Sequence, residues 1–143
     1  MRNKIRMRGW CKEEKVFYKI HGFDLANDVL FRERYPMNKP IPSGRIESVQ
    51  DELYDFEIDY WTGQKDKNGV DIYTNDFLYH KVQETRIVYY PFSKDVPAFG
   101  IRQVDNGMAS TLSNALLYEV IGNKHEHPEL IGDYGNYKEK ERL

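Results

Sequence analysis

The N-terminal segment carries cationic side chains at alternate positions. Together with the tryptophan that follows at the same spacing, they are Arg2, Lys4, Arg6, Arg8 and Trp10. Side chains two residues apart point to the same face of a β-strand, so an extended segment would present them as one stripe. Cations in a row can follow the phosphates of a nucleic acid, and an indole ring can stack on a base. The stripe is therefore a candidate nucleic-acid contact.

A second stripe, of opposite charge, consists of Asp55, Glu57 and Asp59 and has the same two-residue spacing. If the two segments pair as strands, within one chain or between subunits, each cross-strand ion pair contributes about 0.2–1 kcal/mol and helps to fix the register. The phosphate site would then be largely neutralised. Because the chain has a net charge of −2, the ion-paired or solvated interpretation is favoured over nucleic-acid binding.

Other residue types that perform chemistry do not form a recognisable pattern. His125 and His127 could share one face of an extended segment, but a metal site needs three or four suitably spaced ligands. Solvated or capping histidines are favoured. The single cysteine, Cys11, cannot form an intramolecular disulfide, and no base is identifiable for it. The sequence has no phosphate-binding glycine loop and no nucleophile-elbow motif. We therefore predict no catalytic residue, no cofactor and no metal ion.

The elements that would position these side chains are mostly strands. Aromatic residues reach 14% of the chain, and apolar and polar residues alternate in several short segments, as is typical of a β-rich core. The strands predicted in this way are residues 3–10, 16–20, 53–61, 76–82, 85–92, 98–104 and 118–121. A polar turn at 12–15 joins the first two into a hairpin. Residues 108–117 are predicted as a helical or irregular crossover, and 127–131 as a terminal helical turn.

Two tight turns flank a short apolar-alternating segment in the middle of the chain. Asn68-Gly69 predicts a two-residue hairpin connection, because both residues tolerate a positive φ. Asn75-Asp76 predicts a second corner. Several short strands, such turns and a helical crossover before the last strand favour a small five-stranded barrel of the Src-homology-3 type after residue 62.

Residues 24–35 are ambiguous, because Asp24 could cap a short helix that carries Leu25, Val29 and Leu30. A proline-rich loop follows at 36–44. The fold class predicted is mainly β. The expected organisation is an N-terminal strand-rich subdomain at 1–60, a small barrel-like domain at 61–132 and a polar tail at 133–143.

An aromatic ladder precedes the central turns. Tyr54, Phe56, Ile58 and Tyr60 alternate with the acidic stripe and are continued by Trp61. The simplest interpretation is the inner face of a sheet. The alternative is a subunit interface, because a small barrel and a hairpin can leave apolar surface uncovered.

Three blocks of sequence carry a more specific pattern. They are Ile5-Arg6-Met7-Arg8-Gly9-Trp10; Trp61-Thr62-Gly63-Gln64-Lys65-Asp66-Lys67-Asn68-Gly69 with Ile72-Tyr73-Thr74-Asn75-Asp76; and Glu119-Val120-Ile121-Gly122-Asn123 with His127-Pro128-Glu129-Leu130. In this order they resemble the YopX family of phage and prophage proteins, and they reach from residue 5 to residue 130. Asn75 stands where the family usually has Gly, and Asn is the next most tolerant residue of a left-handed backbone.

The resemblance implies a phage or prophage protein of the bacterial cytoplasm, with no assigned activity and no catalytic residues to transfer. The absence of an apolar leader and of any 18-residue apolar run also argues against secretion and membrane spanning. The function expected is that of a non-enzymatic accessory protein that binds another protein, or a second copy of itself. The alternative is a nucleic-acid-binding module that uses the N-terminal stripe. An enzyme would need a pocket that gathers polar residues from distant parts of the chain.

Overall fold

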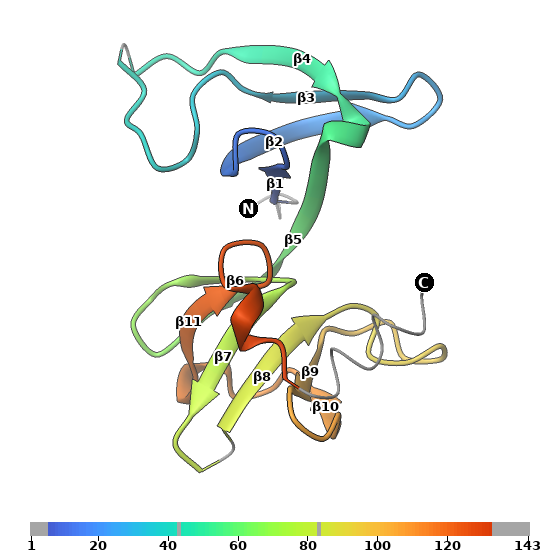
Figure 1. Ribbon diagram of the computed structural model, residues 1–143, viewed down its shortest axis with the longest axis vertical. Coiled ribbons are helices and arrows are strands. Elements are labelled where there is room, and N and C mark those ends of the chain that lie inside the picture. Colours follow the sequence, from blue (N-terminus) through green and yellow to red (C-terminus); the bar gives the residue numbers. More distant parts are fainter. Residues whose placement is uncertain (1–5, 43, 83, 133–143) are drawn as a thin grey trace. The chain divides into compact units, whose positions relative to one another are not determined.

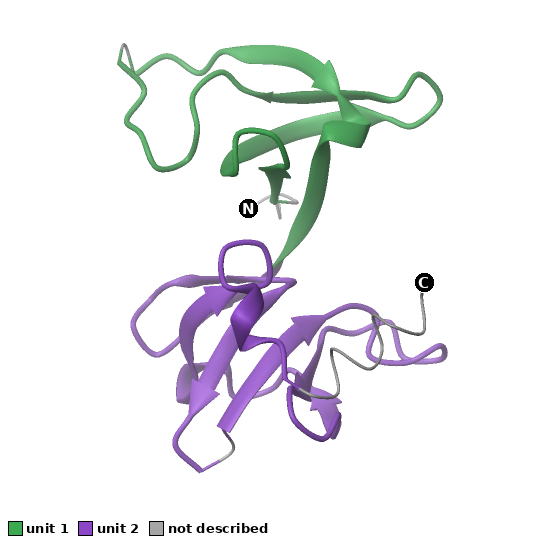
Figure 2. Cartoon of the chain, in the orientation of Figure 1, with its two compact units in different colours: residues 1–61 green, residues 62–143 purple. Residues whose placement is uncertain are grey.

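The computed structural model describes residues 6–42, 44–82 and 84–132, and within these residues the regular secondary structure consists of antiparallel strands and three short 3-10 turns (Figure 1). The chain divides into two compact units, residues 1–61 and 62–143 (Figure 2). The mainly β fold predicted from the sequence is confirmed. In the described part of the chain, no helix has the length and apolar character needed to cross a membrane. The predicted polar tail, 133–143, lies outside the described residues.

Turns and loops of varied length connect the elements. In chain order they are β1 (Met7–Cys11), β2 (Val16–Asp24), β3 (Val29–Glu33), β4 (Ser48–Glu52), the 3-10 turn η1 (Leu53–Asp55), β5 (Phe56–Lys65), β6 (Asp71–Tyr73), β7 (Asp76–His80), β8 (Glu84–Tyr89), β9 (Gly100–Gln103), β10 (Ala109–Thr111), η2 (Ala115–Leu117), β11 (Glu119–Asn123) and η3 (Pro128–Leu130).

The first unit is a twisted sheet folded over one apolar cluster. Its strands belong to a six-stranded sheet in the order β4-β3-β2-β1-β5-β6, in which β5 runs from the first unit into the second and pairs there with β6. Alternate residues of β1, β2 and β5 face the cluster, as the period of a strand requires. The buried members are Cys11, Tyr18, Ile20, Leu30 and Phe56.

The second unit contains a five-stranded sheet in the order β10-β9-β8-β7-β11. Its core consists of Ile72, Leu78, Val88, Ile101, Leu112, Ala115 and Tyr118. The short 3-10 turn η2 precedes the last strand, where the sequence predicted a helical crossover. The strand order has two ends, β10 and β11, so the sheet is open, and the closed form of the predicted barrel is not observed.

The central turn is organised by a buried aspartate. The Oδ1 atom of Asp66 accepts hydrogen bonds from the backbone N–H groups of Asn68 (2.8 Å) and Val70 (2.9 Å), and its Oδ2 atom accepts one from Val120 on β11 (2.9 Å). Burial acts to raise the pKa of Asp66, but these three donors outweigh it and lower the pKa. Of the two residues Asn68 and Gly69, only Gly69 has a positive φ, of 81°, so the prediction that Asn68 also adopts one is wrong. The Asp66 side chain supplies the turn geometry instead.

Residues 24–35 form a turn and strand β3, so the helical alternative is wrong. Asp24 does cap the backbone, but its Oδ1 atom closes a local turn by accepting the N–H groups of Ala26 (3.0 Å) and Asn27 (3.3 Å). Leu25, predicted to lie on the apolar side of a helix, is exposed at the turn. Pairing of β3 with both β2 and β4 supplies more backbone hydrogen bonds than one short helix could.

The strand predicted at 53–61 begins later, at Phe56, after the turn η1. The aromatic ladder is therefore not one inner face: Tyr54 is 69% exposed and Tyr60 is 42% exposed, whereas Phe56 is buried. The 3-10 turn breaks the two-residue period and carries Tyr54 away from the core. Sequence patterns also missed β4 and β10, which are short and mostly polar.

Candidate functional site

The N-terminal stripe lies on β1, a central strand of the first unit's sheet. β1 pairs antiparallel with β2 and with β5, and this register places Arg8 between Lys19 and Asp59. Alternation then puts Arg6, Arg8 and Trp10 on the face opposite the apolar cluster. The structure therefore brings the three described members of the stripe together on one face. Arg2 and Lys4 lie outside the described residues.

Arg8 is held by two neighbouring strands. Its Nε atom donates a hydrogen bond to Oδ2 of Asp59, at 2.9 Å, and its guanidinium carbon lies 4.3 Å from the centre of the Phe17 ring. Asp59 is 0% exposed and Arg8 is 9% exposed. The pairing of the cationic and acidic stripes, one of the two interpretations of the sequence, is thus present at this position. A phosphate that approached Arg8 would compete with a buried carboxylate for the same guanidinium.

Aromatic rings border this ion pair. Trp10 lies directly across from Phe17 in the β1–β2 register, and the two ring centres are 4.9 Å apart in an edge-to-face arrangement. At the other end of β1, the Arg6 guanidinium carbon lies 4.5 Å from the centre of the Trp61 ring. The backbone N–H of Trp61 donates a hydrogen bond to the Arg6 carbonyl oxygen at 3.0 Å. Both tryptophans of the chain are therefore on this face.

We call this surface the aromatic–arginine face, defined by Arg6, Arg8, Trp10, Phe17, Asp59 and Trp61. The sequence identified the arginines, Trp10 and the acidic partner stripe, but it did not assign Phe17 to the site. The signal was present in the hairpin: a turn at residues 12–15 places Trp10 opposite Phe17. The face presents aromatic rings and charged groups held in fixed positions, and none of its six residues is a nucleophile.

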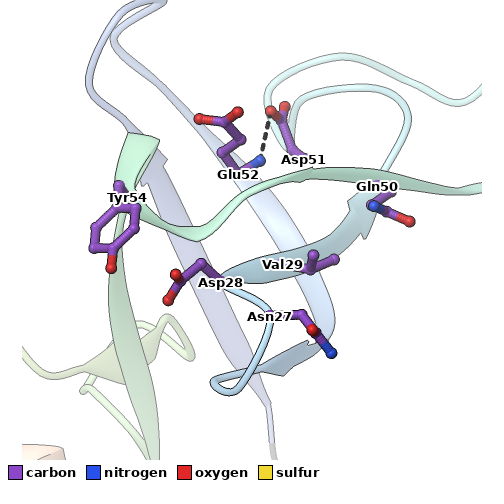
Figure 3. A pocket seen from close by; sticks show the side chains of 7 residues that line it. All are labelled: Asn27, Asp28, Val29, Gln50, Asp51, Glu52 and Tyr54. Atoms are coloured by element: carbon purple, nitrogen blue, oxygen red, sulfur yellow. Dashed lines mark hydrogen bonds between the residues drawn. The ribbon is translucent and has the colours of Figure 1, made fainter.

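A second feature of the first unit is a shallow hollow beside β3 and β4 (Figure 3). Its lining residues are Asn27, Asp28, Val29, Gln50, Asp51, Glu52 and Tyr54. Two of its carboxylates, Asp28 and Asp51, already interact with neighbouring groups. Asp51 accepts hydrogen bonds from Arg32 Nε (3.1 Å) and from the Glu52 N–H (2.9 Å), the latter drawn as a dashed line. The negative charge of Asp28 and its hydrogen bond raise the pKa of Tyr54.

No metal centre emerges from the part of the chain that the structure describes, because no three His, Cys, Asp or Glu side chains converge there. His127 is the residue before η3, as the capping interpretation predicted, but its side chain does not cap that turn. Instead its Nδ1 atom accepts the N–H of Asn123 at 3.2 Å. The ring occupies the space beside Gly122, where a Cβ atom would come within 2.6 Å of Nδ1. The backbone of His125 donates to Asn123 Oδ1 at 3.0 Å.

Geometry and chemistry together define a two-unit antiparallel β protein with an ordered aromatic and charged face. The model of the YopX protein family matches residues 6–132, which is most of the chain. The chain belongs to the YopX family, as its three sequence blocks predicted. No curated protein matches it. Among solved structures, it is similar to protein EF1440 from Enterococcus faecalis, at 24% identity over 91% of this chain and 99% of that one, with a TM-score of 0.49.

Proposed function

We propose that this chain is a non-enzymatic accessory protein that binds another protein through the aromatic–arginine face. The observation that carries the proposal is the buried ion pair between Arg8 and Asp59. Because Asp59 neutralises Arg8, the central cation of the stripe, Arg8 is a weak site for phosphate. Trp10 and Phe17 are then the main ring surface of the face. Tryptophan and arginine are enriched among the residues that dominate protein–protein binding energies.

The charge balance supports a protein partner over a polyanion. Residues 1–61 contain as many acidic as basic side chains, so the first unit has no net charge to attract nucleic acid. The exposed side chains Lys19 and Glu57, which flank the ion pair on β2 and β5, would form a mixed-charge rim. Polar rims around aromatic centres are typical of transient interfaces.

The test is affinity purification from bacterial host cells with three matched baits: the natural chain, Trp10→Ala and Tyr54→Ala. Tyr54 is an exposed aromatic residue of the same unit that lies off the face. We expect one bacterial or phage protein to be retained by the natural chain and by Tyr54→Ala, and lost with Trp10→Ala. Equal retention by all three baits would show that this face is not the binding surface. Circular dichroism of each bait checks folding.

Single-stranded nucleic acid is the second candidate ligand, favoured by the placement of Arg6, Arg8 and Trp10 on one sheet face beside Phe17. Bases stack on aromatic residues of open sheet faces in many single-strand binders. Titration of a fluorescent oligonucleotide at decreasing salt tests it, because phosphate contacts strengthen as salt falls. Binding that stays absent at low salt would exclude this candidate.

The cellular setting and the finer fold type are also part of the proposal. Membership of the YopX family supports an origin in a phage or prophage and a location in the bacterial cytoplasm. Strands β7 to β11, with a 3-10 turn before the last of them, support an open form of the Src-homology-3 type of barrel in the second unit. An experimental structure of residues 62–143 in the intact chain would test the barrel.

A further inference from the structure

The second unit contains an exposed stretch with no charge. Residues 106–118 form the longest run of the chain without Lys, Arg, Asp or Glu, although 31% of all residues are charged. The run includes β10 and η2. Three of its large apolar side chains are exposed to solvent: Met108 is 65% exposed, Leu116 70% and Leu117 56%. Exposed surface that lacks charge and carries large apolar groups is typical of an interface.

Strand β10 ends the five-stranded sheet, and its backbone hydrogen bonds show which groups face outward. The Gln103 N–H donates to the Met108 carbonyl, and the Leu112 N–H donates to the Phe99 carbonyl, both at 2.8 Å. Because hydrogen-bonded pairs alternate along an antiparallel ladder, Ser110 also faces β9. The N–H and C=O groups of Ala109 and Thr111 therefore point away from the sheet, and all three residues of β10 are exposed.

The opposite edge of the same sheet is closed. On β11, the outward N–H of Val120 donates to Asp66 Oδ2 at 2.9 Å, and the Tyr118 carbonyl accepts the Lys67 N–H at 3.0 Å. Across the described residues, no comparable hydrogen bond reaches the outward groups of Ala109 or Thr111. Proteins normally protect sheet edges with charge, proline or covering segments. Among residues 6–42, 44–82 and 84–132, none gives β10 such protection.

We propose that β10 pairs antiparallel with β10 of a second copy of the chain, about a two-fold axis at Ser110. In this register Ala109 lies opposite Thr111 of the second copy, and the two residues exchange N–H···O=C hydrogen bonds on both sides of the axis. The sheets of the two copies become one continuous sheet.

The absence of charge favours a second copy of the chain as the strand that pairs with β10. At the two-fold axis Ser110 faces its own counterpart, so a charged side chain at the axis would face a like charge. A foreign strand could instead complement charges of either sign. The uncharged run 106–118 meets this condition, and small Ser110 allows close approach at the axis. This surface lies in the second unit and is independent of the aromatic–arginine face.

Light scattering coupled to size-exclusion chromatography of the purified chain tests the proposal. We expect a mass twice the 17.0 kDa of one chain. Ser110→Lys places like charges across the axis, and Thr111→Pro removes an outward N–H without touching the bonds to β9. Both variants should elute as monomers. The control Val82→Lys adds the same charge at an exposed position off this edge, and it should remain a dimer.

Disulfide trapping gives a second, positive readout. Ser110 and its counterpart would form a non-hydrogen-bonded pair with Cα atoms about 4.5 Å apart, which is within the range that a disulfide spans. Ser110→Cys should therefore give a covalent dimer under mild oxidation, while the natural chain, whose Cys11 is buried, and Val82→Cys should not. A natural chain that is monomeric at every concentration would overturn the proposal. So would a dimer that survives both edge variants and does not cross-link through residue 110.

Discussion

The two units bury an aspartate in different ways. Asp59 in the first unit is 0% exposed and faces the Arg8 guanidinium, whereas Asp66 in the second is 1% exposed and accepts three backbone N–H groups. A buried carboxylate needs compensation in either case. In the first unit the compensation comes from another side chain, so both partners can be exchanged together. In the second it comes from three main-chain N–H groups, which stay in place when the acid is replaced.

Arg8→Met should have the largest effect, because it leaves Asp59 buried without its cation. We expect a loss of about 3–5 kcal/mol in the free energy of unfolding, and recovery of most of that loss in the double variant Arg8→Met/Asp59→Leu. Both tryptophans lie in residues 1–61, so tryptophan fluorescence during urea unfolding reports on the first unit. A double variant no more stable than the single one would show that the cation is not what Asp59 requires.

Asp66→Asn should have a smaller effect, since the amide keeps one oxygen for the turn but presents an NH₂ group to the Val120 N–H. Leaving that buried donor unpaired is expected to cost about 1–3 kcal/mol. Hydrogen exchange followed by mass spectrometry should show faster exchange in β11, with residues 7–11 unchanged. Asp105→Asn, at an exposed turn, is the control and should exchange like the natural chain. Unchanged protection of β11 would mean that Asp66 does not hold this edge.

The dependence of the unfolding free energy on pH in the acid range should also show the contribution of Asp66. Its pKa is lowered in the folded state below the ordinary 3.8, so its contribution is complete above the unfolded pKa and is lost as pH falls through the folded pKa. The difference in unfolding free energy between the natural chain and Asp66→Asn should therefore shrink below about pH 4. The pKa values of Glu33 and Asp24 are also lowered, and these residues leave a residual slope in both proteins. A pH-independent difference would contradict the assignment.

Asn75 should give the smallest effect. It has a φ of 69°, its N–H donates to the Val88 carbonyl, and its own carbonyl accepts the Lys124 N–H, so the left-handed main chain is held on both sides. Asn75→Gly should change the unfolding free energy by about 0.5 kcal/mol or less, and Asn75→Ala should lower it by about 1 kcal/mol. Thermal unfolding by circular dichroism measures both. An alanine variant as stable as the glycine variant would mean that the left-handed backbone carries no strain.

Side-chain alternation predicted the sheets of this chain well wherever one face is apolar. It located β1, β2, β7, β8 and β9, because each contains buried apolar residues. It failed for β4 and β10, whose polar residues give no period although the backbone still pairs. It also placed Tyr54 and Tyr60 inside. Pattern alone cannot show that a 3-10 turn interrupts the strand, or that the face of Asp59 is covered by arginine and aromatic rings.

The site was partly predictable for an electrostatic reason. Two stripes of opposite charge at equal spacing predict paired strands, and Arg8 and Asp59 are paired in the structure. The burial of that pair was not predictable, because it depends on Phe17 packing over the guanidinium. The open edge at β10 was also hidden. The sequence shows the uncharged run, but only the hydrogen-bond pattern shows which backbone groups face outward.

The continuity of β5 sets a limit on how this molecule can be divided. The boundary between Trp61 and Thr62 falls inside the strand Phe56–Lys65. Trp61 is tied to Arg6 on one side of that peptide bond, and the Thr62 hydroxyl donates to the Ile72 carbonyl at 2.8 Å on the other. Because both sides of the boundary are hydrogen-bonded, proteases should cut this segment slowly. Cleavage there would split one continuous strand, so each fragment would carry only part of it.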